Sequence, residues 1–158
     1  RCKTTNSYDL EFGFSCMGYE IAGGWGAKMA DPTRDVIVMV GDGSYMLMNS
    51  DIYSTVLTGH KLIVILCDNG GYAVISRLQQ FKGTPGFNNL LKDCRVKEPF
   101  QVDFVKNAES MGALARRCDT LADLEAGRES PLVRNDAPGD QYSRSSDNMR
   151  IALPRTIL

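Results

Sequence analysis

Hydrophobic residues in the first part of the chain fall into short unbroken runs separated by segments of mixed polarity. Two runs, DVIVMV at 35–40 and KLIVILC at 61–67, are rich in β-branched residues and do not alternate with polar ones. This pattern is typical of strands in a parallel sheet that are buried on both faces. We therefore expect buried, parallel strands at 35–40 and 62–67 that are adjacent or nearly so.

Segments with helical spacing of hydrophobic residues lie before, between and after these runs. Residues 18–30 show this spacing and end at Asp31-Pro32, and residues 46–57 show it and end before Gly59. Strand, turn, helix and strand in this order form a βαβ unit, which requires a parallel sheet and a right-handed crossover. The chain further predicts helices at 72–80, at 103–111 with Asp103 as cap and at 120–126, a strand at 114–118 and a long loop at 81–99. The predicted fold class is therefore α/β, a parallel β-sheet flanked by helices.

The pattern changes after Gly127. Residues 128–158 are rich in Arg, Ser, Asp and Pro and show no sustained period. Two interpretations fit: a disordered tail, or natural sequence lost through a shifted reading frame or a cloning artefact. We therefore divide the chain into a folded domain at 1–127 and an irregular tail at 128–158, and expect the sheet to be truncated or aberrant at its C-terminal end. The chain opens at Arg1 without a signal peptide, which suggests a piece of a longer protein.

Composition and charge exclude several classes of function. The 158 residues carry 18 Lys and Arg against 19 Asp and Glu, so no strong global field attracts nucleic acid or an anionic membrane. No apolar run approaches the roughly 20 residues of a membrane span. A single His and five Cys without C-x-x-C spacing argue against a zinc site and a disulfide framework. Reduced cysteines fit the cytosol, so we expect a cytoplasmic protein with no nucleic-acid or membrane partner.

Candidate chemistry lies in two glycine-rich turns that follow the predicted strands. Asp42 lies in the first turn (GDGS) and Asn69 in the second (DNGG), 27 positions apart. Because parallel strands end at the same sheet edge, where open α/β sheets bind ligands, we expect these side chains to lie together. A carboxylate oxygen of Asp42, an amide oxygen of Asn69 and the carbonyl oxygen of Gly71 would suit Mg²⁺. These three residues are the predicted metal ligands.

The first turn also suits a diphosphate. Gly41 and Gly43 let the backbone approach phosphate oxygens, and the amides of Gly43, Ser44 and Tyr45 open a helix whose N-terminus attracts anions. Without a metal, the acid at position 42 would repel a phosphate, which disfavours a nucleotide binder of Rossmann type. Two ordinary strand-end turns at this distance are the plainer alternative.

The pair of turns closely resembles the thiamine-diphosphate signature of the decarboxylase and acetolactate-synthase superfamily. The signature often ends in two asparagines, and Asp68 stands at the first of these positions. Upstream, CMGY at 16–19 resembles a G-x-M-G segment of the same enzymes. The resemblance implies thiamine diphosphate and Mg²⁺ as cofactors. It places Met17 and Gly18 at the cofactor, with Met17 as the apolar wedge that bends it; a plain core methionine is the alternative.

Further segments resemble one branch, the trihydroxycyclohexanedione hydrolases of myo-inositol catabolism. They are FSCMGYEIAGG, VGDGSYMLMNS, NGGYAVISRLQQ and GFNNLL, and the resemblance covers roughly residues 8–126. It implies the diphosphate-binding domain of a hydrolase that acts on carbon–carbon bonds in ketonic substances and opens a cyclic 1,2-dione. Alternatives are an acetolactate synthase or 2-oxo-acid decarboxylase, and a non-catalytic fragment.

The resemblance also implies that the active site is shared between subunits. The activating glutamate of the superfamily comes from the N-terminal pyrimidine-binding domain of a neighbouring subunit, and no acid of this chain lies in a matching motif. We therefore assign no catalytic residue, expect a homodimer or homotetramer for the full-length enzyme, and expect the isolated chain to be inactive. Tyr72 is either a core residue or a cofactor contact, and Arg77 a solvated or interface charge. Asn88-Asn89 is interpreted as a structural loop, with a substrate or domain contact left open.

Overall fold

A four-stranded parallel sheet forms the centre of the computed structural model, which describes residues 4–5, 7–98, 100–129 and 149–154. The strand order is β1-β2-β4-β3, and each neighbouring pair is parallel. The strands are β1 (Ile37–Gly41), β2 (Leu62–Cys67), β3 (Leu114–Cys118) and β4 (Met149–Pro154). The predicted parallel pairing of the first two strands is therefore confirmed.

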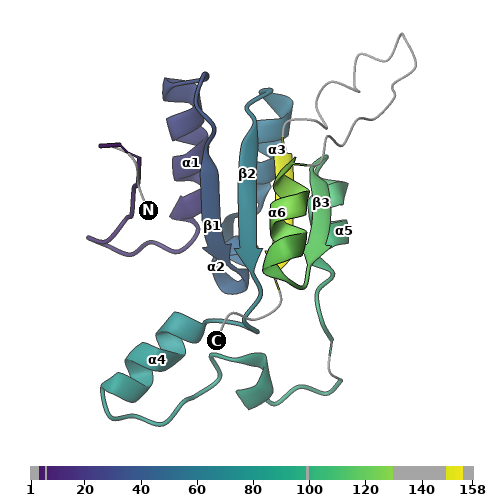
Figure 1. Cartoon of the computed structure of the whole chain (residues 1–158). Coiled ribbons are helices and arrows are strands. Elements are labelled where there is room, and N and C mark those ends of the chain that lie inside the picture. The colour runs from purple at the N-terminus through teal and green to yellow at the C-terminus, as the bar shows by residue number, and fades with distance from the viewer. Residues whose placement is uncertain (1–3, 6, 99, 130–148, 155–158) are drawn as a thin grey trace.

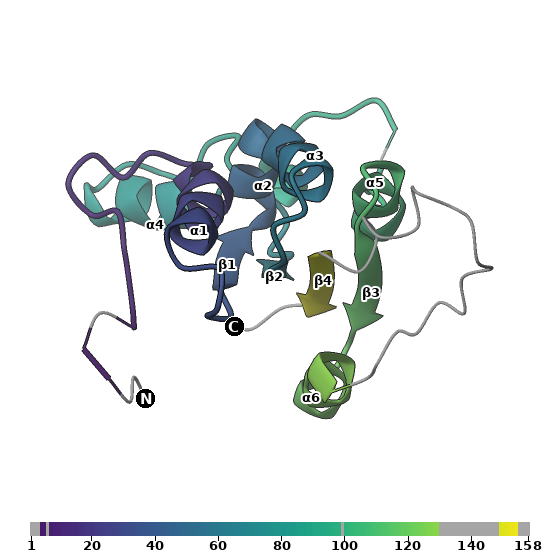
Figure 2. The same cartoon turned by 90° about the horizontal axis from the view of Figure 1, so that it is seen from above.

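Helices cover the sheet unequally on its two faces. They are α1 (Tyr19–Ala30), α2 (Asp42–Met48), α3 (Ser50–Leu57), α4 (Ala73–Phe81), α5 (Phe104–Ser110) and α6 (Leu121–Glu129), with a short 3-10 turn at Leu91–Asp93. Figure 2 shows α1, α2, α3 and α5 on one face, and α6 on the other, beside β3. This is the predicted α/β class, a parallel sheet flanked by helices.

The hydrophobic core lies between the sheet and the layer of helices α1, α2, α3 and α5. Alternate residues of β2 are buried there, as the period of a strand requires. The buried hydrophobic cluster comprises Ile21, Val38, Val40, Tyr45, Ile52, Val56, Leu62, Val64, Leu66, Phe104, Ala108 and Ala113. Because β1, α2 and β2 all contribute to it, the core fixes the two strand ends from which the candidate site is built.

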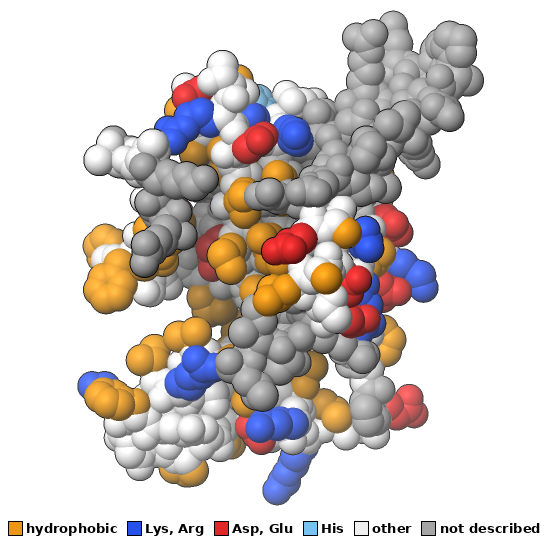
Figure 3. Space-filling model, in the orientation of Figure 1, with side chains coloured by type: hydrophobic (Ala, Val, Ile, Leu, Met, Phe, Trp, Pro, Cys, Tyr) orange, Lys and Arg blue, Asp and Glu red, His pale blue; other side chains and the backbone are white. Residues whose placement is uncertain are grey.

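The prediction that β1 is buried on both faces is wrong. Val38 and Val40 are buried, but Ile37 is 52% exposed and Met39 is 64% exposed. Figure 3 looks onto this face and shows hydrophobic side chains gathered over β1 and β2. Within the described residues, the helix on this face is α6, and it lies beside β3 rather than over β1. The apolar run of β1 is typical of a strand buried on both faces, but the described helices cover only one face of this strand.

The irregular tail expected at 128–158 contains regular structure. Helix α6 continues to Glu129, and β4 pairs with β2 through Leu62 and Met149 and with β3 through Leu114 and Arg150. The sequence MRIALP of β4 is a short apolar run, which was missed because it follows a long polar segment. Strand β4 pairs with the free side of β2 and joins β3 to the sheet as its edge strand. Residues 130–148 and 155–158 of the expected tail lie outside the described residues.

The helix predicted at 46–57 begins earlier and is divided. Helix α2 starts at Asp42, directly after β1, and α3 follows it after Asn49. In the described part of the chain, no helix is long and apolar enough to cross a membrane.

Candidate metal centre

The two glycine-rich turns meet at one edge of the sheet, as predicted. Gly41 at the end of β1 pairs in register with Cys67 at the end of β2, so Asp42 and Asn69 emerge side by side. Figure 1 shows both strands ending at this edge, beside α2 and α4. The backbone N–H of Asn69 donates to Oδ1 of Asp42 at 3.3 Å, which joins the turns directly.

Polar atoms of three residues converge at this junction. One terminal atom of the Asn69 side-chain amide lies 2.9 Å from the carbonyl oxygen of Gly71 and 3.1 Å from Oδ1 of Asp42. With nitrogen in that place, the amide donates to both oxygens. A half-turn of the amide group puts its oxygen there instead, and the two orientations have the same shape. Three oxygens from Asp42, Asn69 and Gly71 then face one another.

The spacing of these atoms fits an octahedral cation. Mg²⁺–oxygen bonds are near 2.1 Å, so adjacent ligands of an octahedron are about 3.0 Å apart. The separations of 2.9 and 3.1 Å match that edge length. The donor set of the junction therefore fits Mg²⁺ when the Asn69 amide presents its oxygen.

Asp42 is buried, although it lies in a turn. The residue is only 6% exposed. Burial is the largest influence on its pKa and raises it; the N–H of Asn69 lowers it, and the nearby carboxylate of Asp68 raises it again. A cation in contact with a buried carboxylate stabilises its ionised form.

The start of α2 provides free backbone donors next to Asp42. Gly41 is the N-cap and Asp42 the first helical residue. The N–H groups of Gly43 and Ser44 therefore have no acceptor within the helix, whereas the N–H of Tyr45 is the first that meets one, the carbonyl of Gly41. The N–H groups of Gly43 and Ser44 are thus placed for the predicted diphosphate contact, whereas the N–H of Tyr45 also has an acceptor within the helix.

Tyr45 anchors the first turn to the core. Its side chain is fully buried and packs edge-on against Phe104, with ring centroids 5.7 Å apart. Its hydroxyl donates to Oδ1 of Asn107 at 2.8 Å, and Nδ2 of Asn49 donates to the same atom at 3.3 Å. These contacts tie α2 to α5. The cofactor contact predicted for Tyr45 stays a prediction, and its side chain has a structural role.

Tyr72 lies between the two turns. A Cβ placed on Gly43 would be 2.5 Å from Cδ1 of Tyr72, so the ring rests directly on the backbone of the first turn. Tyr72 is 38% exposed, which places it at the edge of the site rather than in the core. The cofactor contact of Tyr72 stays a prediction. Arg77 is exposed on α4.

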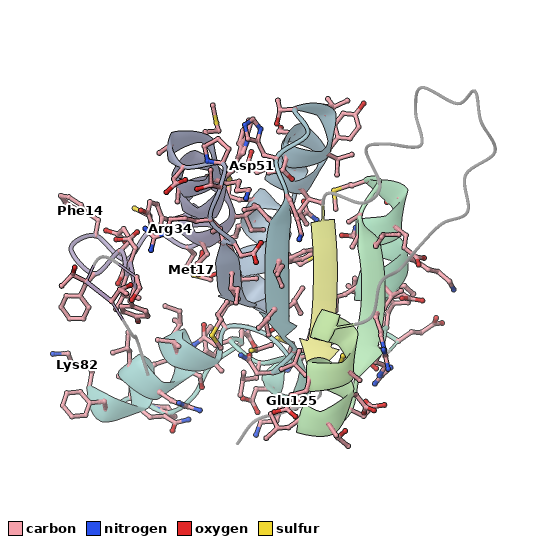
Figure 4. The ribbon with its side chains drawn as sticks, turned by 45° about the horizontal axis from the view of Figure 1, so that its top comes forward. Phe14, Met17, Arg34, Asp51, Lys82 and Glu125 are labelled. Atoms are coloured by element: carbon pink, nitrogen blue, oxygen red, sulfur yellow. The ribbon has the colours of Figure 1, made fainter. Side chains whose placement is uncertain are left out.

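Met17 and Gly18 lie at the start of α1, close to the end of α2. Gly18 is buried, and a Cβ on it would be 2.3 Å from Cγ of Met48. Its N–H donates to Oε2 of Glu20 at 2.9 Å. Met17 is half-buried, and Figure 4 shows it beside β1. The wedge role of Met17 and the cofactor contact of Gly18 remain predictions.

The loop at Asn88-Asn89, interpreted above as structural, packs against the second glycine-rich turn (DNGG, 68–71), called the metal turn below for its predicted ligands. The carbonyl of Asn89 accepts the N–H of Tyr72 at 2.7 Å, and the N–H of Leu91 donates to the carbonyl of Gly70 at 2.9 Å. Gly71 and Leu90 form an antiparallel bridge between these bonds. Spacing along the chain could not reveal this contact, because the loop returns only after α4. The one indication in the sequence that this loop has a role was that its GFNNLL segment resembles the trihydroxycyclohexanedione hydrolases.

One protein family matches most of the chain. The family described as thiamine pyrophosphate enzyme, C-terminal TPP binding domain, matches residues 1–136. The chain belongs to this family.

Several similar proteins share one name. The chain is 38% identical over 130 residues to 3D-(3,5/4)-trihydroxycyclohexane-1,2-dione hydrolase of Geobacillus thermodenitrificans, covering 78% of this chain and 20% of that protein. It is 37% identical over 128 residues to the protein of that name from Bacillus subtilis, covering 78% of this chain and 19% of the relative. The chain thus spans about a fifth of the length of these relatives.

Among solved structures, the fold is similar to that of a Rhodococcus jostii thiamine diphosphate-dependent 4-hydroxybenzoylformate decarboxylase. The TM-score is 0.67 at 21% identity, and the match covers 89% of this chain and 23% of the other. This likeness supports the fold.

Proposed function

We propose that this chain binds the diphosphate of thiamine diphosphate through Mg²⁺ at the carboxyl edge of β1 and β2. The observation that carries the proposal is that the Asn69 amide lies 2.9 Å from the Gly71 carbonyl oxygen and 3.1 Å from Oδ1 of Asp42, where the two turns meet. The donor set contains only oxygens, which Mg²⁺ prefers, and one buried carboxylate supplies the charge. Family membership independently points to the same cofactor.

Each residue of the two turns has a distinct part in this proposal. Asp42, Asn69 and Gly71 hold the cation, and the free N–H groups of Gly43 and Ser44 bind phosphate oxygens at the start of α2. Tyr72 packs on Gly43 at the edge of the junction. When bound, the cofactor supplies an electron sink for breaking a carbon–carbon bond. The chain's own residues bind it and orient it.

We further propose that the domain serves a hydrolase that opens a cyclic 1,2-dione in inositol catabolism. The support is the shared name of the relatives at 35–39% identity. Since the chain spans about a fifth of those proteins, the activating glutamate would come from the pyrimidine-binding domain of a neighbouring subunit. The isolated chain would then be inactive, and the working enzyme would be a cytoplasmic homodimer or homotetramer.

Exposed apolar side chains support a partner domain. Tyr8, Leu10, Phe12 and Phe14 alternate along the segment before α1 and are 60–91% exposed. Large apolar side chains exposed together along one segment are typical of an interaction surface in soluble proteins.

A thermal-shift titration of the full chain tests the cofactor proposal. At 100 times the dissociation constant, a ligand stabilises the folded state by about 2.7 kcal/mol, which raises Tm by roughly 5–10 °C for a chain of this size. Mg²⁺ and thiamine diphosphate together should give such a rise, and neither should give it alone. Asp42→Ala should abolish the rise while leaving the unliganded fold intact, and Asn69→Ala should reduce it.

The matched control is Asp51→Ala, which removes an acid from α3 outside both turns. An equal thermal shift in the Asp42→Ala and Asp51→Ala variants would refute the metal assignment. The substrate proposal needs the longer enzyme, supplied with both the cyclic dione and pyruvate. Turnover of pyruvate alone would favour the acetolactate-synthase or decarboxylase alternative.

A further inference from the structure

Helix α4 follows the metal turn but is weakly packed. Ser76 is its buried residue, while Val74, Leu78 and Phe81 are 65%, 53% and 82% exposed. Figure 1 shows the helix beyond the carboxyl ends of β1 and β2, outside the layers that enclose the core. Apolar burial therefore contributes little to its position, and hydrogen bonds between α4, the metal turn and the loop after α4 must set it.

Gln79 accepts several hydrogen bonds from the loop after α4. Its side-chain oxygen accepts from Nδ2 of Asn89 at 2.7 Å and from the N–H of Phe87 at 3.1 Å. Its carbonyl oxygen accepts from the hydroxyl of Thr84 at 2.8 Å and from the N–H of Thr84 at 3.2 Å. One residue thus holds the loop from Thr84 to Asn89 against α4 at both ends.

Asn89, held in this way, controls the orientation of the third metal ligand. The carbonyl of Gly71 and the N–H of Tyr72 belong to one planar peptide group, so fixing either end fixes the other. That N–H donates to the carbonyl of Asn89 at 2.7 Å, and the carbonyl of Gly71 faces the opposite way, towards the Asn69 amide. Asn89 also packs tightly on this peptide, because a Cβ on Gly71 would be 2.5 Å from its carbonyl oxygen.

We propose that Gln79 is a positioning residue for the cation: through Asn89 it fixes the peptide that aims the Gly71 carbonyl. This inference rests on the proposed Mg²⁺ site and adds a residue that does not touch the metal. Mg²⁺ demands near-ideal octahedral geometry, whereas Ca²⁺ accepts flexible sites with longer bonds. Loosening one ligand should therefore weaken Mg²⁺ binding more than Ca²⁺ binding, whereas general destabilisation would weaken both alike.

The test is calorimetric titration of the full chain with Mg²⁺ and, separately, with Ca²⁺ at a fixed excess of thiamine diphosphate. Removing a residue that orients a metal ligand typically lowers metal affinity about 10- to 100-fold. Gln79→Leu keeps the size of the side chain and removes its acceptor, so it should lower Mg²⁺ affinity at least about tenfold and Ca²⁺ affinity less than about threefold. Gln79→Glu keeps acceptor oxygens and should restore the Mg²⁺ preference.

Two further variants keep the test decisive. Gln80→Leu makes the same change at the exposed neighbouring position of α4 and should leave both affinities unchanged. Asn89→Ala removes the donor of the same hydrogen bond from outside any helix, so it should reproduce the loss of preference even where Gln79→Leu fails to fold. An unchanged Mg²⁺ to Ca²⁺ ratio in Asn89→Ala overturns the inference. A wild-type chain that binds neither cation instead overturns the proposed function, and the inference with it.

Discussion

The two turns of the candidate site differ in what holds them. The first, at residues 41–45, enters the core: Asp42 to Tyr45 are all buried, and Tyr45 reaches α5. The second, at residues 69–72, is half-buried or exposed and is held by hydrogen bonds to the loop around Asn89. The proposed metal ligand of the first turn is thus fixed by packing, and those of the second turn are held by a few polar contacts near solvent.

This difference gives the two turns different roles in the proposed site. A segment with few buried apolar contacts opens locally at lower free energy than the core does. The first turn can therefore hold its carboxylate in place before any ligand arrives, whereas the second can adjust the Asn69 amide. A cation that bridges both turns would stabilise the second more than the first.

The largest effect is expected where the first turn is anchored. Tyr45→Ala removes a fully buried ring and should destabilise the fold by about 3–5 kcal/mol, measured by urea unfolding. Tyr45→Phe keeps the ring and leaves Oδ1 of Asn107 with one donor fewer, which should cost about 1 kcal/mol. Equal losses in the two variants would show that the hydroxyl, rather than the buried ring, anchors α2.

An intermediate effect is expected at the second turn. Gly70 and Gly71 both have positive φ, 79° and 132°, but only Gly71 has the Asn89 carbonyl within 2.5 Å of an added Cβ. Gly70→Ala should cost only the left-handed conformation, about 1–2 kcal/mol. Gly71→Ala should cost more and should also reduce the Mg²⁺-dependent thermal shift, since the Asn89 loop must move.

Equal stability of the Gly70→Ala and Gly71→Ala variants would contradict the close packing of Asn89 on this turn. A normal Mg²⁺-dependent shift in Gly71→Ala would separate the loop from the metal site.

Much of the fold and the centre of the site followed from local patterns. The β-branched runs placed β1 and β2, and strand-end turns in a parallel sheet had to share an edge, so Asp42 and Asn69 were found together. Asp103 caps α5 as predicted, by accepting the N–H of Lys106. These features depend on a few neighbouring residues, which a sequence displays directly.

What escaped prediction depends on segments distant along the chain. The exposure of Ile37 and Met39 depends on which helices cover the sheet, not on the strand's own residues. The loop at Asn89 reaches the metal turn only because α4 reverses the chain between them. The interior place of β4 follows from its pairing with β2 and β3, which no local pattern specifies.

The smallest effect is expected at the cap of α5, the helix that carries both partners of Tyr45. The N–H of Lys106 donates to Oδ1 of Asp103 at 3.1 Å, and this bond, followed by contact with the Lys106 side chain, lowers the pKa of the Asp103 carboxyl below its ordinary value of 3.8. A carboxyl with a lowered folded-state pKa contributes stability that is fully present above the ordinary value and is lost as pH falls through the folded-state pKa.

Asp103→Ala should therefore lower Tm modestly at neutral pH, and its difference from the wild type should shrink as the pH falls below about 4. Asp103→Asn keeps an acceptor for the Lys106 N–H and should lose less at neutral pH, because Asn also caps helices well. Thermal unfolding of the three proteins across this pH range measures both effects. A Tm difference for Asp103→Ala that stays constant on acidification would show that ionisation of the cap does not contribute to the stability of α5.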